Sequence, residues 1–234
     1  IALTAPFILT EDFQSSEDYF VSPFMATIFR AIRFIAVIIA LLLPAFYVTA
    51  QLFKMQLIPL GLMLNIASSV QGLPLSPSLE MFLVLLVLEV LKEASVRMPR
   101  AVGMAMSIVG ALVLGETAVK AGIISSPAVM ITALSSIALY VAPNQEGTLT
   151  LLRVAFTVLG GLGGMYFMLV GMLYLVLYLC SMGGFGTPYL APLAPFVPGD
   201  LKDSFYRASL LRMNERPKSV SYTHLRAHET RSNL

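Results

Sequence analysis

The chain has 234 residues, of which 57% are hydrophobic and only 12% charged, and its mean hydropathy is +0.82. Soluble domains carry about 25% charged residues, so this composition excludes an ordinary soluble domain and indicates a membrane protein. The net charge of +2 comes without a basic, aromatic-rich tract and so gives no sign of nucleic-acid binding, and the single Cys180 excludes an internal disulfide. Charge-free runs at 34–53, 121–145 and 154–199 each reach the roughly 20 residues that cross a bilayer.

The N-terminal part mixes apolar and acidic side chains before the first long apolar run. We expect residues 1–25 to be the end of an upstream soluble domain followed by an acidic connector. The multi-span membrane domain is predicted at 26–198, and its first crossing is expected at 34–53 with a kink at Pro44. The following stretch, 55–70, is shorter and typical of an interfacial or re-entrant segment.

The remaining apolar stretches predict an all-α polytopic membrane protein. We expect about five full transmembrane helices plus one short or re-entrant helix. The alternative is four crossings together with re-entrant segments. Further helices are expected at 77–98, 99–119, 127–141 and 151–179, with Ser76 capping the first, Pro99 separating the first two and glycines loosening the last.

Basic residues set the expected orientation. They precede the first span and fill a tail at 199–219, so both flanks are expected on the cytoplasmic side and the number of crossings is expected to be even. Residues 220–234 resemble the translation of a sequencing adapter and are predicted to be non-native.

A charged joint runs from Glu89 to Arg100, where the helices expected at 77–98 and 99–119 meet. Its spacing lets Glu89 pair with Lys92, and Glu93 with Arg97, along one stripe. The stripe is either an ion-paired structural joint or a pore mouth or coupling element. Glu80, nine residues before Glu89, points to the opposite face and is interpreted as a first-turn carboxylate that complements the helix dipole.

The helix at 99–119 carries two further candidate features. Glu116 lies deep in apolar sequence, where a carboxylate is costly, so it is either an ion-path acid or the i, i+4 partner of Lys120. A small residue recurs at every fourth position, which favours a close helix contact over a pore-lining face. This ridge consists of Gly103, Ser107, Ala111 and Gly115.

Enzyme chemistry has little support in the sequence. Both histidines, His224 and His228, lie in the segment predicted to be non-native, so neither a zinc-binding HExxH motif nor a Ser–His pair is available. The aspartates lie outside the expected spans. We therefore expect no enzyme activity, no catalytic residue, no metal and no cofactor.

Several short strings stand out along the chain by their order and spacing. They are Glu17-Asp18-Tyr19, Arg30 with Arg33, Leu43-Pro44-Ala45 with Tyr47, Glu93-Ala94 with Arg97 and Pro99, residues 107–112, Ala121-Gly122, Leu152-Arg153 and residues 185–192. Together they resemble the membrane domain of the A subunit of GerA-type spore germination receptors, and the resemblance covers roughly residues 5–218.

This resemblance implies a subunit of an inner-spore-membrane complex. Its partners would be a nutrient-binding B subunit and a lipoprotein C subunit, and copies of the A subunit would form a homo-oligomeric ion channel that opens on germinant binding. A non-conducting scaffold subunit and a SpoVAF-like accessory ion channel are the alternatives; a secondary transporter ranks lower, because no paired inverted repeat is evident. Glu116 stands where the family pattern leads us to expect Gln.

Overall fold

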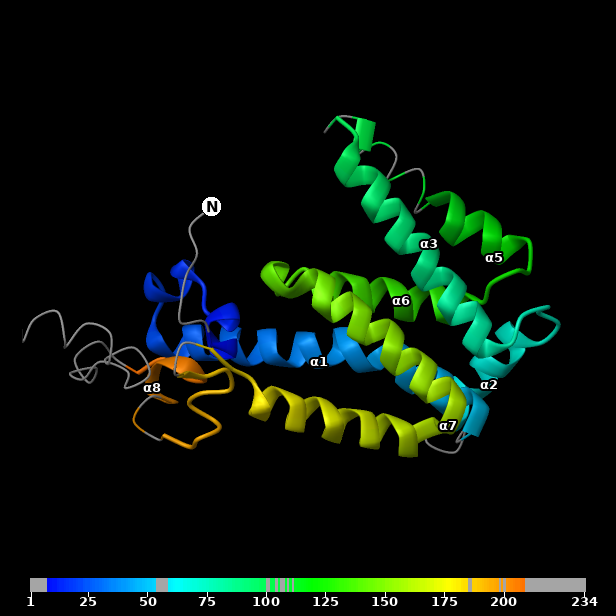
Figure 1. Ribbon diagram of the computed structural model, residues 1–234. Helices are drawn as coiled ribbons and strands as arrows, with labels where there is room; N and C mark the ends of the chain where they lie inside the picture. The colour runs from blue at the N-terminus through cyan, green and yellow to red at the C-terminus, as the bar shows by residue number, and fades with distance from the viewer. Residues whose placement is uncertain are drawn as a thin grey trace, which may run out of the picture. The chain divides into compact units, whose positions relative to one another are not determined.

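The computed structural model describes residues 8–53, 59–99, 102–103, 105, 108, 110, 112–184, 187–197, 199 and 201–208 (Figure 1). These residues are mostly helical, which confirms the all-α class; their strands are the two-residue β1 (Gly183–Gly184) and β2 (Thr187–Pro188), paired antiparallel. The predicted non-native segment 220–234 and residues 209–219 of the predicted tail lie outside the described residues. The chain divides into two units, residues 1–36 with 172–234 (unit 1) and residues 37–171 (unit 2).

Unit 1 gathers short elements around the start of the first long helix. In chain order they are the 3-10 helices η1 (Leu9–Phe13) and η2 (Ser16–Tyr19), the first part of α1 (Pro23–Phe53), the end of α7 (Glu146–Ser181), the two strands and α8 (Leu201–Ser204). Phe34 on α1 stacks between Phe13 and Phe205, with ring centroids 3.9 and 4.6 Å apart. This aromatic stack joins the N-terminal segment to the segment after α8.

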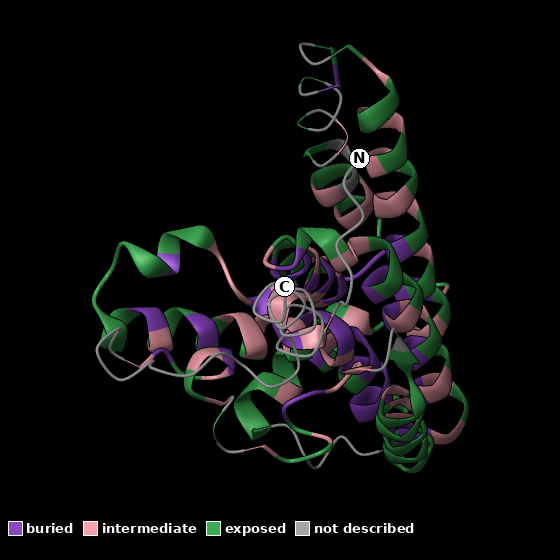
Figure 2. Cartoon of the chain, turned by 60° about the vertical axis from the view of Figure 1, so that its left-hand side comes forward, coloured by how far each residue is buried: buried purple, intermediate pink, exposed green. Residues whose placement is uncertain are grey.

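Unit 2 is built from the other helices. They are the rest of α1, α2 (Leu60–Val70), α3 (Pro77–Arg97), the π-helical turn η4 (Val113–Thr117), α5 (Ala118–Lys120), α6 (Ser126–Leu139), the 3-10 turn η5 (Pro143–Gln145) and the first part of α7. Helix α3 ends at Arg97, two residues before Pro99, as expected from the restriction that proline places on its predecessor. The core consists of Tyr47, Val48, Ile66, Met81, Val84, Leu85, Ile124 and Ala128, part of the buried set drawn purple in Figure 2.

The prediction of about five full spans is not supported. Two stretches of the described chain are long and apolar enough to cross a membrane, namely α1 and Pro143–Ser181. Helices α2 and α6 have only 11 and 14 residues. The count was too high because hydropathy measures the apolar run but not where the helix stops. Near α6, turn-forming residues on both sides shorten the run at 121–145 to less than a full span.

Helix α7 reverses direction at Gly164, whose φ of 60° and ψ of −146° are not helical. A Cβ added to Gly171 would lie 2.8 Å from Leu159 Cδ1, although twelve residues of straight helix would separate these positions by about 18 Å. Residues 165–171 therefore fold back on the segment before Gly164 (Figure 1). The span predicted at 151–179 lies within Pro143–Ser181, which is long and apolar enough to cross a membrane, but its helix is broken at Gly164, because a positive φ at a glycine allows a sharp change of direction inside an apolar run.

Candidate functional site

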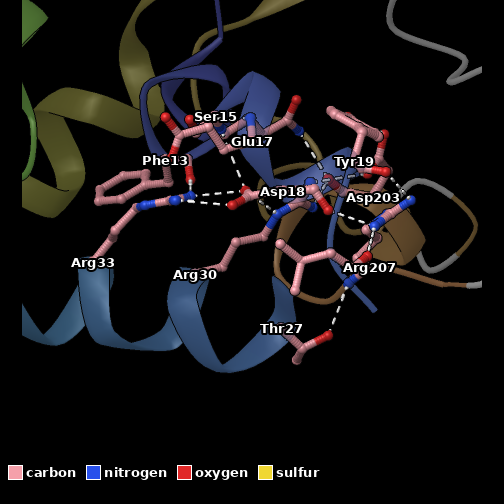
Figure 3. Close-up of polar contacts among 12 residues, drawn as sticks. Phe13, Ser15, Glu17, Asp18, Tyr19, Thr27, Arg30, Arg33, Asp203 and Arg207 are labelled. Atoms are coloured by element: carbon pink, nitrogen blue, oxygen red, sulfur yellow. Dashed lines mark hydrogen bonds and ion pairs between the residues drawn. The ribbon is translucent and has the colours of Figure 1, made fainter. Parts of the chain in front are cut away.

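A buried cluster of arginine and aspartate side chains lies in unit 1 (Figure 3). At its centre is Asp18 on η2, which is only 1% exposed. Arg33 donates to its two carboxylate oxygens from Nη1 and Nη2 at 2.7 and 2.8 Å, a bidentate pair, and Arg30 donates from Nε at 3.2 Å. Both arginines lie on the first turns of α1, so the carboxylate fixes the N-terminal connector against that helix.

These contacts decide the ionisation of Asp18. Burial of the carboxyl opposes its ionisation, but hydrogen bonds from Arg33, from the backbone N–H of Ser15 and from Arg30, together with the charge of Arg33, outweigh burial and lower the pKa of Asp18 below its usual value. The charged form of Asp18 is thus the form that the folded unit stabilises.

Arg30 also contacts the segment after α7. Arg30 donates from Nη1 to the backbone carbonyl of Asp203 and from Nη2 to its carboxylate at 3.2 Å, and Tyr19 donates its hydroxyl to that carboxylate at 3.0 Å. Arg207, 5% exposed, donates to the carbonyls of Asp18, Val21 (2.6 Å) and Tyr19 (3.2 Å). We call Asp18, Arg30, Arg33, Asp203 and Arg207 the arginine–aspartate cluster. The cluster links the connector before α1 and the segment around α8, which are far apart in the sequence, to the start of α1.

A second charged group lies in unit 2, where α3 meets α7. Lys92 Nζ lies 2.9 Å from carboxylate oxygens of both Glu89 and Glu146, and Arg153 Nη2 lies 3.9 Å from Glu89. Arg153 is only 2% exposed and donates to Ser136 at 3.0 Å. The group surrounds a cavity of about 80 Å³ lined by Leu88, Glu89, Lys92, Ser136, Leu139, Tyr140, Glu146 and Arg153.

The other predicted charges form local pairs instead of joining that cavity. Glu93 pairs with Arg97 at 2.6 Å on an exposed part of α3. Glu116 pairs with Lys120 at 2.5 Å, and both side chains are more than half exposed. Glu116 lies in the π-helical turn η4, a geometry that is frequent at functional sites. The two i, i+4 pairings follow the sequence spacing, while a role of these residues in ion flow or coupling stays a prediction.

The small-residue ridge is described only at its ends. A Cβ on Gly103 would lie 2.6 Å from the backbone oxygen of Ser95, so this glycine permits close approach to α3. Gly115 has no atom within 4 Å of the corresponding position. Ser107 and Ala111 lie outside the described residues, so the predicted ridge stays a prediction.

Comparison with known proteins connects this architecture to germination. Residues 1–219 match the family described as Bacillus/Clostridium GerA spore germination protein. The chain belongs to this family. Spore germination protein KA of Bacillus subtilis (strain 168) is 39% identical over 94% of the chain, the uncharacterized membrane protein YfkQ of the same strain 37% over 94%, and spore germination protein GerLA of Bacillus cereus 34% over 93%.

This GerA-family chain spans only 41%, 43% and 44% of the length of those three relatives. No solved structure matches it. Within the described part of the chain, no group of three or more His, Cys, Asp or Glu side chains could hold a metal ion.

Sequence reasoning missed the arginine–aspartate cluster of this GerA-family chain. Arg30 entered only as a basic flank of the first span and as part of the resemblance, because its partner Asp203 is almost at the other end of the chain. In the second charged group the predicted pairing of Glu89 with Lys92 is confirmed at 2.9 Å, whereas the parts of Glu146 and Arg153 were missed. The sequence did hold a usable signal for Arg153. It is the only charged residue in the apolar stretch 147–199, and an isolated charge in such a stretch is a candidate functional residue.

Proposed function

We propose that the chain is the membrane domain of the A subunit of a spore germinant receptor in the inner spore membrane. In this proposal it assembles with copies of itself into an ion channel that opens on germinant binding, together with a nutrient-binding B subunit and a lipoprotein C subunit. The observation that carries the proposal is the family match over residues 1–219, with 39% identity to spore germination protein KA.

The charges inside unit 2 support an ion-conducting role. Charged side chains within apolar helices generally face a bundle interior or a water-filled path, because lipid does not solvate them. Arg153 is 98% buried in the apolar stretch Pro143–Ser181, and it shares a cavity with Lys92, Glu89 and Glu146. Such a polar lining is the kind of surface that an ion path requires.

The arginine–aspartate cluster supports coupling to partner subunits. It joins the connector before α1, the start of α1 and the segment around α8 through buried ion pairs. A partner that displaced either the connector or the C-terminal segment would have to break these pairs. The start of α1 would therefore respond to a binding event outside the membrane span.

A non-conducting scaffold is the second candidate, and the pairing of Glu116 with Lys120 favours it, since the pair removes the net charge that a cation path would use. Planar-bilayer recording from the purified full-length oligomer separates the two. We expect single-channel currents, and an intact oligomer without current would leave the scaffold. Flux coupled to a transported solute would indicate a transporter.

The contribution of Glu116 is tested in the same recordings. Glu116→Gln removes one negative charge per subunit, so its reversal potential in asymmetric salt should shift toward lower cation preference. Glu17→Gln, at an exposed carboxylate on η2, is the matched control. An unchanged reversal potential in Glu116→Gln would remove this acid from the ion path.

A further inference from the structure

A second set of polar side chains is buried in unit 2, away from the charged cavity. Tyr47 and Gln51 lie one turn apart near the end of α1, Glu80 lies in the first turn of α3, and Ser125 caps the start of α6. Their exposed fractions are 3%, 7%, 0% and 2%. We call these four residues the Glu80 cluster. Three separate helices thus deliver oxygen-bearing side chains to one dry region.

Glu80 is a fully buried carboxyl group without a compensating positive charge among the described residues. One carboxylate oxygen, Oε1, accepts the backbone N–H of Ser125, whereas Oε2 has no hydrogen-bond partner among the described residues. No described lysine or arginine nitrogen lies within 4.0 Å of it. The neighbouring Met81, Val84 and Leu85 are buried core residues. A lone carboxylate in such surroundings is strongly unfavourable unless a cation or a proton balances it.

The position of Glu80 in the first turn of α3 does not account for this burial. The helix dipole stabilises a nearby carboxylate only modestly, and a carboxylate obtains this stabilisation without being buried. The hydrogen bond to Ser125 satisfies one oxygen only. The second oxygen therefore needs a further explanation.

Gln51 and Tyr47 supply that explanation. Neither Oε1 nor Nε2 of Gln51 makes a hydrogen bond of normal geometry among the described residues. The Gln51 amide lies within weak hydrogen-bonding reach of Tyr47, which also interacts with the charge of Glu80. A poorly paired amide near a carboxylate with one unpaired oxygen is a costly arrangement that a bound cation would relieve.

Tyr47 and Ser125 share a long hydrogen bond across the cluster. Its oxygens, Tyr47 Oη and Ser125 Oγ, are 3.4 Å apart, compared with the usual 2.5–3.0 Å of a hydroxyl hydrogen bond, and this spacing also suits two ligands of one small cation. Oxygens about 2.4 Å from a cation and at right angles to each other are separated by about 3.4 Å; this contact length is that of Ca²⁺, whose radius is close to that of Na⁺.

We infer that the Glu80 cluster binds one dehydrated monovalent cation of the size of Na⁺, with oxygens of Glu80, Gln51, Tyr47 and Ser125 as ligands. A monovalent ion fits because the cluster contains one carboxylate and three neutral groups, and a divalent ion would leave a buried positive charge. The site goes beyond the proposed function: binding at Glu80 does not require conduction, and a scaffold subunit would show it equally.

The test is thermal unfolding of the purified full-length protein in detergent, with choline chloride replaced by sodium chloride at constant ionic strength. We expect the midpoint temperature of unfolding to rise with the sodium concentration and then to level off. At a sodium concentration a hundredfold above the dissociation constant, the rise should be about 5–10 °C. Glu80→Gln should abolish the sodium-dependent rise, and the exposed-carboxylate control Glu17→Gln should keep it. If Glu80→Gln fails to fold, Gln51→Leu should raise the half-saturating sodium concentration at least tenfold.

Three results would overturn the inference. Equal midpoints in sodium and choline would mean that no sodium binds. A sodium-dependent rise that survives in both Glu80→Gln and Gln51→Leu would place the ion elsewhere. A midpoint that rises on acidification but not with sodium would make a proton the occupant. Loss of channel current with the sodium shift intact would count against conduction alone.

Discussion

Neutralising Asp18 should release the C-terminal segment from the start of α1. Asp18→Asn keeps the shape of the side chain but presents an NH₂ group to guanidinium donors that now contact both carboxylate oxygens. The substitution leaves Arg30, which is fully buried, with only the carboxylate of Asp203 for compensation. It therefore perturbs the whole arginine–aspartate cluster from its centre.

The size of the effect follows from burial. Removing one partner of a buried ion pair costs about 3–5 kcal/mol. The Arg33 side chain is 19% exposed and can turn toward water, so the lower end applies. About 3 kcal/mol corresponds to a roughly hundredfold larger population of the opened segment, since each 1.4 kcal/mol is a factor of ten.

Amide hydrogen exchange of the full-length protein measures this opening. The backbone amide of Arg207 donates to Thr27 Oγ1 at 3.1 Å, so peptides that cover 201–208 report the docked segment. We expect their exchange to quicken about a hundredfold in Asp18→Asn. Glu17→Gln is the neighbouring control and should leave exchange unchanged. Equal exchange in Asp18→Asn and the parent would refute the reasoning that these ion pairs hold the segment.

The effect has a defined pH dependence. The folded-state pKa of Asp18 is lowered, so its contribution is fully present above the unfolded-state pKa of about 3.9 and is lost as the pH falls through the folded-state value. Protection of 201–208 in the parent should accordingly hold from neutral pH down to about pH 4 and decline below it. In Asp18→Asn this acid-dependent step should be absent.

Two further predictions address unit 2. Gly160→Ala should destabilise the protein by about 1–3 kcal/mol in thermal unfolding, because a Cβ at this position would lie 2.8 Å from the backbone oxygen of Ala45. The control Gly147→Ala, where no atom lies within 4 Å of the new Cβ, should be neutral or slightly stabilising. A change in stability of the same sign in both variants would contradict close packing of α1 on α7. Arg97→Glu should lower the free energy of unfolding by only about 0.2–0.5 kcal/mol plus the repulsion from Glu93, since the pair is exposed. The double variant Glu93→Arg with Arg97→Glu should restore the lost stability in the same thermal unfolding. If it does not, the two residues do not act as a pair.

Features that depend on neighbours in the chain could be predicted from the sequence. The start of α3 at Pro77 and its end before Pro99 follow from local backbone restrictions. The pairs of Glu93 with Arg97 and of Glu116 with Lys120 follow from helical spacing alone. These features require no knowledge of how the helices pack.

Features that depend on packing could not be predicted. Glu80 was assigned to a helix dipole on its position, but its complete burial arises from α1 and α6, which pattern analysis does not place beside α3. Arg30 pairs with Asp203, which is 173 residues away in the sequence, and the charge pattern of the sequence cannot predict such a pair. The number of spans was overestimated because the length of an apolar run does not show where its helix stops, and α2 and α6 have only 11 and 14 residues.

The break in α7 has a consequence for how much of that helix one crossing can hold. Undivided, the 36 residues of α7 would be about 54 Å long, well beyond the roughly 30 Å of a bilayer core. The break at Gly164 leaves two legs of about 26 Å each, close to the thickness of that core. Each leg by itself is therefore about as long as a membrane crossing, whereas the unbroken helix would have exceeded one.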